Sequence, residues 1–179
     1  MLKLNILISL ILFVWPLFSQ EINKQPDSKP VYFFGPTVGI ALNANNGNFV
    51  LNTGFSFELQ HNSNLYNVYY QSFFDYGPES LNGSDKEFSF TYSRIFGLKK
   101  VFFGIGSGVS IIKITNKLEW ISEDTQKRVQ TIKMGIPVEF RIGTMNPDKS
   151  IRLIDLNFFG NINSETSYYG CKIHFNIKL

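Results

Sequence analysis

Hydrophobic residues alternate with polar or small residues along most of the chain, from Val31 to Leu179. This period of two is typical of β-strands, and no stretch shows the 3.6-residue period of an amphipathic helix. The alternation falls into eight segments, which predict strands at about residues 31–42, 49–60, 66–75, 87–93, 101–111, 131–142, 154–162 and 172–179. An even number of long antiparallel strands predicts an all-β fold, namely an eight-stranded antiparallel up-and-down β-barrel.

The alternation does not say which face of the strands points outward, and composition helps to decide. The polar face carries mainly Gly, Ser, Thr, Asn and Gln, and only 17% of all residues are charged. The segment that begins at Val101 shows this clearly, because Gly104, Gly106 and Gly108 share one face while bulky apolar residues fill the other. Small and amide side chains suit a narrow interior in which every polar group needs a partner. We therefore expect the apolar face to point toward lipid, in a transmembrane β-barrel.

The lengths of the predicted connections favour the same arrangement. The two longest, residues 76–85 and the segment from Thr115 to Arg128, both fall at the end away from the termini. Outer-membrane barrels have short periplasmic turns and longer extracellular loops, which matches this distribution. The 115–128 segment contains Trp120 and six charged residues. It is expected either to bind an extracellular partner or to be a solvated loop with Trp120 at the lipid interface.

The first 30 residues do not alternate. Residues 1–19 contain one positive charge, Lys3, an apolar core broken by Pro16, and the small residue Ser19 before Gln20, which together predict a cleaved secretory signal peptide. The apolar run is too short for a membrane-spanning helix. Residues 20–30 are polar and are expected to form a periplasmic tether, so residues 31–179 would form the barrel domain. The sequence therefore predicts export and a location in the bacterial outer membrane.

Two glycine-containing segments and the end of the chain carry a family resemblance. The segments are FGIGSG at residues 103–108 and GIPVE at residues 135–139, and the last strand alternates up to Leu179. They resemble the small eight-stranded outer-membrane β-barrel families of Gram-negative bacteria, the outer membrane protein beta-barrel domain. The C-terminus is similar to the assembly signal of these barrels, although that signal normally ends in Phe rather than Leu. The resemblance implies insertion into outer-membrane lipid, with the outer-membrane assembly machinery as a partner.

Five ionisable residues form the main candidate site. Hairpin register places Glu139 and Arg141 near Asp155, while Lys172 and His174 lie on the next strand, all on the polar face. Such a group could be a proton or ion path through the barrel, or a plug of mutually neutralised ions. We expect the plug, because eight strands enclose little more than their own side chains and because unpaired buried charge is costly. No second histidine is near, so no metal site, cofactor or catalytic residue is predicted.

A short motif raises an enzymatic alternative. His61-Asn62-Ser63-Asn64 is similar to the His-x-Ser-Asn element of outer-membrane lipid A deacylases, in which His and Ser serve acyl transfer. Here the motif lies on a predicted periplasmic turn and has no identified acidic partner. Those enzymes act on the outer leaflet and carry the element late in the chain. The motif is therefore interpreted as a polar hairpin turn, and the lipid-modifying enzyme stays as an alternative.

The remaining features narrow the choice of function. A net charge of +3 spread along the chain gives no basis for nucleic-acid binding. The single cysteine, Cys171, excludes a disulfide framework and is expected on the apolar face. Pro36 and Pro137 fall within predicted strands, where each removes a ladder hydrogen bond, so a bulge or an interior water is expected at each. The sequence thus predicts a non-enzymatic outer-membrane barrel with a structural or loop-mediated binding role, and a secreted lipocalin-like binding protein is the second alternative.

Overall fold

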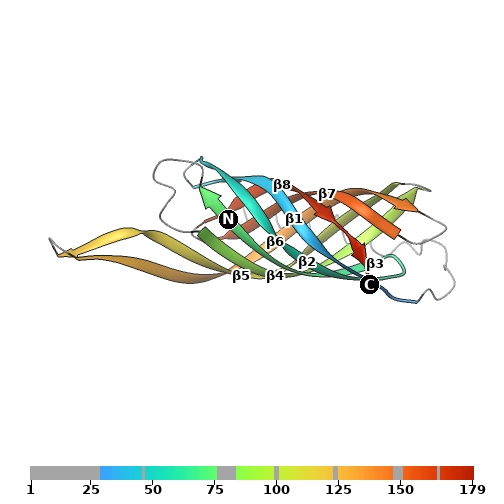
Figure 1. The fold of residues 1–179 in the computed structure, drawn as a ribbon, viewed down its shortest axis with the longest axis horizontal. Helices are drawn as coiled ribbons and strands as arrows, with labels where there is room; N and C mark the ends of the chain where they lie inside the picture. The colour runs from blue at the N-terminus through green and yellow to red at the C-terminus, as the bar shows by residue number, and fades with distance from the viewer. Residues whose placement is uncertain are drawn as a thin grey trace, which may run out of the picture.

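The chain forms one closed β-barrel (Figure 1). The computed structural model describes residues 29–45, 47–75, 84–98, 101–122, 125–146, 151–164 and 166–179. Its strands are β1 (Val31–Asn43), β2 (Phe49–His61), β3 (Asn64–Asp75), β4 (Ser84–Leu98), β5 (Val101–Ser122), β6 (Thr125–Asn146), β7 (Ile151–Asn163), β8 (Tyr168–Phe175) and β9 (Ile177–Lys178). Strands that follow one another from β1 to β8 pair antiparallel, and β1 also pairs with β8 and β9, which closes the sheet. Because β9 continues the path of β8, the barrel is eight-stranded, as predicted.

The eight strands include the segments where the alternation of the sequence predicts them, and β5 and β6 extend well beyond these segments. Alternation predicts strands because a closed barrel gives each strand one inner and one outer face. The predicted signal peptide and residues 20–28 of the predicted tether lie outside the described residues. Within the described part of the chain, no helix is long and apolar enough to span a membrane.

The two prolines interrupt the hydrogen-bond ladder without shifting it. Pairing of β1 passes from β8 to β9 around Pro36, and the register is the same on both sides. Around Pro137, pairing of β6 with β5 stops and then resumes in the same register. The prediction of a bulge is therefore wrong at both sites, and the interior water, its alternative, stays a prediction. Each proline lacks an N–H and so loses a local hydrogen bond, but the neighbouring pairs hold the strands in line.

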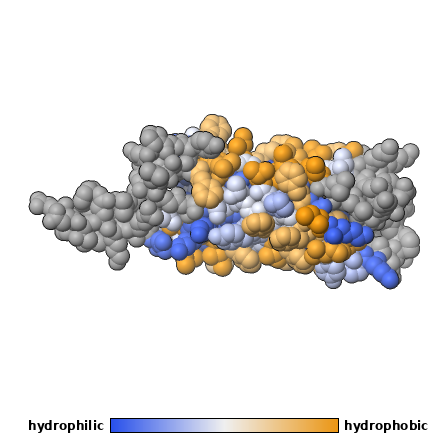
Figure 2. Space-filling model, in the orientation of Figure 1, coloured by the Kyte–Doolittle hydropathy of each residue, from blue (hydrophilic) through white to orange (hydrophobic). Residues whose placement is uncertain are grey.

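Large apolar side chains cover the outside of the barrel, where Figure 2 shows a broad hydrophobic belt. All eight strands contribute to it; exposed examples are Ile40, Phe55, Tyr70, Phe88, Ile111, Ile136, Ile154 and Ile173. The predicted apolar-out orientation is confirmed. A lipocalin-like barrel needs its apolar face inside, so the chain does not have that arrangement.

The two ends of the barrel differ in shape. At one end the start of β1 lies beside Leu179, because the Leu179 N–H donates to the Tyr32 carbonyl over 3.0 Å. At the other end, the β5–β6 hairpin projects well beyond the remaining strands (Figure 1). We call these the termini end and the hairpin end.

The 115–128 segment is not a loop, which corrects the prediction. β5 continues to Ser122, and β6 begins at Thr125, which pairs with Ser122. Two register shifts interrupt the pairing of this extension. The density of charged residues suggested an irregular connection, but a hairpin outside the apolar belt needs no apolar face. The backbone N–H and C=O groups of its two strands form hydrogen bonds with one another.

Candidate functional site in the barrel interior

The interior has three layers along the barrel axis. At the hairpin end an apolar cluster comprises Ala41, Val50, Phe73, Phe159 and Tyr168. At the termini end a second apolar cluster comprises Leu65, Ile95 and Phe102. Between them lies a polar layer whose side chains are almost completely inaccessible to solvent, among them Glu58, Gln71, Glu87, Glu139, Arg141, Asp155, Lys172 and His174.

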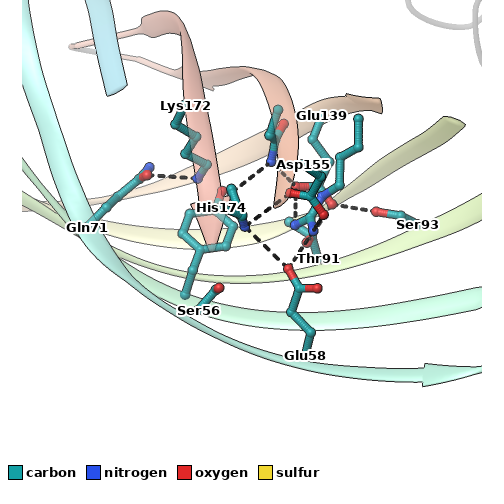
Figure 3. A network of polar contacts seen from close by, with 12 residues as sticks. Ser56, Glu58, Gln71, Thr91, Ser93, Glu139, Asp155, Lys172 and His174 are labelled. Atoms are coloured by element: carbon teal, nitrogen blue, oxygen red, sulfur yellow. Dashed lines mark hydrogen bonds and ion pairs between the residues drawn. The ribbon is translucent and has the colours of Figure 1, made fainter. Parts of the chain in front are cut away.

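Arg141 is the centre of the polar layer, and its carboxylate neighbours Glu58, Glu139 and Asp155 are labelled in Figure 3. Its Nη1 lies 2.5 Å from Glu58 Oε1 and 3.9 Å from Asp155 Oδ2, and its Nη2 lies 3.2 Å from Glu139 Oε2. Arg141 and Glu139 come from β6, Asp155 from the neighbouring β7, and Glu58 from β2. One guanidinium therefore joins carboxylates from opposite walls of the barrel, and its several donors allow it to do so.

Hydroxyl and amide groups complete the hydrogen bonding of Glu139. The Thr91 hydroxyl donates to Glu139 Oε1 over 3.1 Å, and the Ser93 hydroxyl donates to the same oxygen. The Asn157 Nδ2 donates to Glu139 Oε2 over 3.1 Å. With Arg141, this carboxylate has partners on both oxygens, which is what a fully buried charge requires.

His174 on β8 is the direct Cα partner of Asp155 on β7. Its Nδ1 is 3.4 Å from Glu58 Oε1 and 3.9 Å from Asp155 Oδ1. Asn157 Nδ2 lies 3.4 Å from its Nε2. The imidazole is thus packed between carboxylates and an amide and is completely buried.

Lys172 belongs to a second group, nearer the hairpin end. Its Nζ donates to Gln71 Oε1 over 2.9 Å. The same ammonium lies 3.9 Å from the centre of the Tyr69 ring and 4.8 Å from that of Phe159. Aromatic faces attract cations, and the attraction is strongest where water is excluded. The rings therefore help to hold a lysine charge that is fully buried.

Glu87 is held by neutral donors. Gln71 Nε2 donates to its Oε2 over 2.7 Å, and Asn161 Nδ2 donates to its Oε1 over 2.5 Å. The hydroxyls of Ser89 and Tyr69 also donate to Oε1, the latter over 3.5 Å. Gln71 thus links Glu87 to Lys172 through its two ends. Hydrogen bonds to an ionised acceptor are stronger than neutral ones, which stabilises this carboxylate inside the barrel.

The interior chemistry is that of a packed network. Its ionised side chains contact one another or neutral donors, and it is covered by apolar layers at both ends. Asn52 and Asn67 differ from their neighbours, because they are fully buried and their side-chain amides make no hydrogen bond within the described residues. In the same part of the chain, no group of His, Cys, Asp and Glu side chains could hold a metal ion.

The predicted grouping of five ionisable residues is confirmed for four of them. Glu139, Arg141, Asp155 and His174 lie in one connected cluster, while Lys172 extends from the same layer toward Gln71. Sequence reasoning missed Glu58 and Glu87, together with the aromatic partners of Lys172. Glu58 and Glu87 are visible in the sequence as rare acids on the polar face. Arg141, the partner of Glu58, and Asn161, one partner of Glu87, come from distant strands across the barrel, so the sequence does not reveal these contacts.

The deacylase-like motif lies at the termini end. β2 ends at His61, β3 begins at Asn64, and Asn62 has a φ of 55°, so the motif is a two-residue hairpin turn. The Ser63 carbonyl accepts a hydrogen bond from the Ile95 N–H over 2.8 Å. Asn64 Oδ1 accepts from Tyr92 and Arg94 of β4. These contacts join neighbouring strands, as expected of a structural turn.

Two further predicted features have simpler outcomes. Cys171 is on the outer face, half-buried, and its Cα partner on β1 is Ile40, which agrees with its predicted apolar surroundings. The side chain of Trp120 lies outside the described part of the molecule. Its proposed role in partner binding or at the lipid interface therefore stays a prediction.

No protein-family model matches the chain, and no curated protein sequence matches it either. Solved structures do match its fold. The N-terminal β-barrel domain of OprF from Pseudomonas aeruginosa has a TM-score of 0.51 and 14% identity, covering 85% of this chain and 100% of that one. Neisserial surface protein A has a TM-score of 0.55 and 10% identity, covering 84% of this chain and 99% of that one.

A third match is Ail, the attachment invasion locus protein of Yersinia pestis, with a TM-score of 0.50 and 12% identity, covering 85% of this chain and 100% of that one. The chain has the fold of the small eight-stranded outer-membrane β-barrels. This confirms the predicted fold class. Lipid offers no hydrogen-bond partners to polar groups. A barrel of this fold in a membrane therefore needs an apolar outer surface and an interior whose polar groups bond to one another.

Proposed function

We propose that the chain is a non-enzymatic integral outer-membrane β-barrel protein whose interior is plugged and whose hairpin end carries a structural or partner-binding role. The observation that carries the proposal is the reversal of the usual protein pattern, with apolar side chains outside and ionised side chains inside. Only a surrounding hydrocarbon phase makes such an outer surface favourable. The outer membrane is the location of the solved barrels that share the fold.

The proposed plug rests on the three interior layers. Charged residues in the middle layer contact one another or accept hydrogen bonds from neutral donors, and apolar side chains fill the interior on both sides. Eight strands leave space only for their own side chains. A protein of this kind inserted in a planar bilayer should therefore give no stable ion conductance. Regular single-channel steps would contradict the plug.

The proposed binding role rests on the projecting β5–β6 hairpin. β5 continues beyond the part that pairs with β4, and β6 extends beyond the part that pairs with β7. In the projecting part, the outer edges of β5 and β6 therefore have no neighbouring strand among the described residues. One barrel of the same fold is named for attachment and invasion. In the proposed orientation, the hairpin faces the outside of the cell, while the termini and the tether face the periplasm.

Fractionation tests the location most directly. The full chain, produced in a Gram-negative host, should lose its predicted signal peptide and should sediment with the outer membrane after a carbonate wash. It should migrate differently on gels before and after boiling, as a folded barrel. Recovery in the soluble periplasm or the culture medium would overturn the proposal.

Cysteine labelling tests the orientation. In a Cys171→Ser background, Ser122→Cys places a thiol at the hairpin, and Ser63→Cys places one at the turn of the termini end. A membrane-impermeant maleimide should label the hairpin thiol on intact cells. It should reach the turn thiol only after the envelope is opened. The opposite pattern would reverse the orientation.

A further inference from the structure

Two lysines face each other on the outer surface near the hairpin end. Lys86 of β4 and Lys113 of β5 are direct partners in the antiparallel pairing. Both side chains are exposed, and each lies one position before or after a buried residue, Glu87 or Ile112, which points into the barrel. Side chains opposite each other in such a pair have Cβ atoms about 5 Å apart. The two ammonium groups can therefore reach one site on the outer face.

The lysine pair has no counter-ion within the described part of the protein. Neither ammonium makes a hydrogen bond or an ion pair there, and the described outward side chains around them are Ser72, Phe88, Ile111, Thr115 and Ile132. The neighbouring acid, Asp85, is engaged elsewhere. It accepts a hydrogen bond from the Tyr168 hydroxyl and another from the Thr115 N–H over 2.8 Å.

The position of the pair relative to the apolar belt indicates what could neutralise it. Like charges directly opposite in a sheet destabilise the pair of strands unless an anion lies between them. The next outward residues toward the middle of the barrel are Phe88 and Ile111, which are 53% and 50% exposed and belong to the belt. The lysines thus lie at the edge of the belt, at the depth of lipid headgroups. An anion at this point would have hydrocarbon directly below it.

We propose that Lys86 and Lys113 form a binding site for the phosphate group of a lipid whose acyl chains lie against Phe88 and Ile111. In the orientation proposed above, on which this inference rests, the site faces the outer leaflet, so the ligand is the phosphorylated lipid of that leaflet, lipid A. Ammonium groups bind phosphate through charge-assisted hydrogen bonds. A phosphate between the lysines also removes their mutual repulsion, and the apolar pair below supplies contact with the chains.

Thermal unfolding in detergent micelles tests the site. Lipid A should raise the unfolding temperature of the wild-type protein, whereas lipid A freed of its phosphates should not. The double variant Lys86→Gln/Lys113→Gln should lose this gain, with affinity for lipid A lowered about fivefold for each lysine removed. Without lipid A the same variant should be at least as stable as wild type, because the repulsion is gone. A purely structural pair of lysines would not produce this reversal of sign.

Three controls separate the outcomes. Lys178→Gln removes an exposed lysine at the termini end and should leave the response to lipid A unchanged. Lys86→Arg/Lys113→Arg keeps both charges and should retain most of it. The lipid assignment is overturned if inorganic phosphate alone gives the full gain, or if the double variant responds like wild type. Failure of the wild-type protein to form a heat-modifiable barrel would instead refute the proposed function and the site with it.

Discussion

At the hairpin end of the interior, Phe73 stacks on Tyr168 with ring centroids 4.1 Å apart, whereas in the middle layer Arg141 joins carboxylates from opposite strands. Both regions are fully buried, yet one is held by apolar contact and the other by charge. Burial in this fold therefore does not select a residue type by itself. Apolar packing tolerates small changes in shape, while a charge network fails as soon as one partner is missing.

The largest expected effect comes from removing the central cation. Arg141→Met leaves Glu58 and Glu139 without their shared guanidinium and should lower the free energy of unfolding by about 4 kcal/mol. The measurement is a urea titration of the protein in lipid vesicles. Arg94→Met is the matched control, because Arg94 makes its hydrogen bond to Asn64 at the rim of the barrel. Equal losses for the two variants would contradict the central role of Arg141.

Truncation in the apolar layer should have the next largest effect. Phe73→Ala removes a buried ring and should lower the free energy of unfolding by about 3 kcal/mol in the same titration. The adjacent Phe74 points outward and is 42% exposed, so Phe74→Ala should cost less. If the outward variant proved the more harmful, the packing role of the apolar layer would be wrong.

A smaller loss is expected at the carboxylate that has neutral partners. Glu87→Gln keeps the size of the side chain but weakens the hydrogen bonds from Gln71 and Asn161, and should lower the free energy of unfolding by about 2 kcal/mol. Glu58→Gln should cost more, because it also withdraws a negative charge from Arg141. The two variants, measured side by side, show whether charge pairing or hydrogen bonding dominates the middle layer.

The smallest effect should have the opposite sign. The Asn67 amide is buried without a hydrogen bond in the described part of the chain, so Asn67→Leu should raise the free energy of unfolding by about 1 kcal/mol. Asn161→Leu is the control and should lower it, because Asn161 donates to Glu87 and Ser110. Destabilisation by Asn67→Leu would mean that this amide also belongs to the network.

Much of the fold could be predicted from the sequence, because alternation is a local signal. The eight strands and their order follow from it, while the outward apolar face follows from the small and amide side chains of the polar face and from the lengths of the connections. The grouping of Glu139, Arg141 and Asp155 could be predicted too, since their strands are joined by one hairpin. Local pairing could not bring Glu58 to Arg141, because contact across the interior depends on how the whole sheet closes.

Two other misses have physical causes. Tyr69 and Phe73 interrupt the polar face of β3 in the sequence, and both point inward, where Tyr69 lies against the Lys172 ammonium and Phe73 stacks on Tyr168. The extension of β5 and β6 was missed because charged residues commonly mark loops in water. Strand pairing needs only backbone hydrogen bonds, which the sequence pattern does not reveal.

The break in the ladder at Pro36 has a consequence for the order of folding. Every other pair of neighbouring strands is joined by a hairpin, while β1 must find β8 at the far end of the chain. Closing that seam carries the largest loss of chain entropy of any pairing in the molecule. It is also where Gly35 leaves no room for a side chain beside the Phe175 carbonyl, and where pairing passes from β8 to β9. We therefore expect the seam to be the last pairing to form and the first to part when the barrel opens.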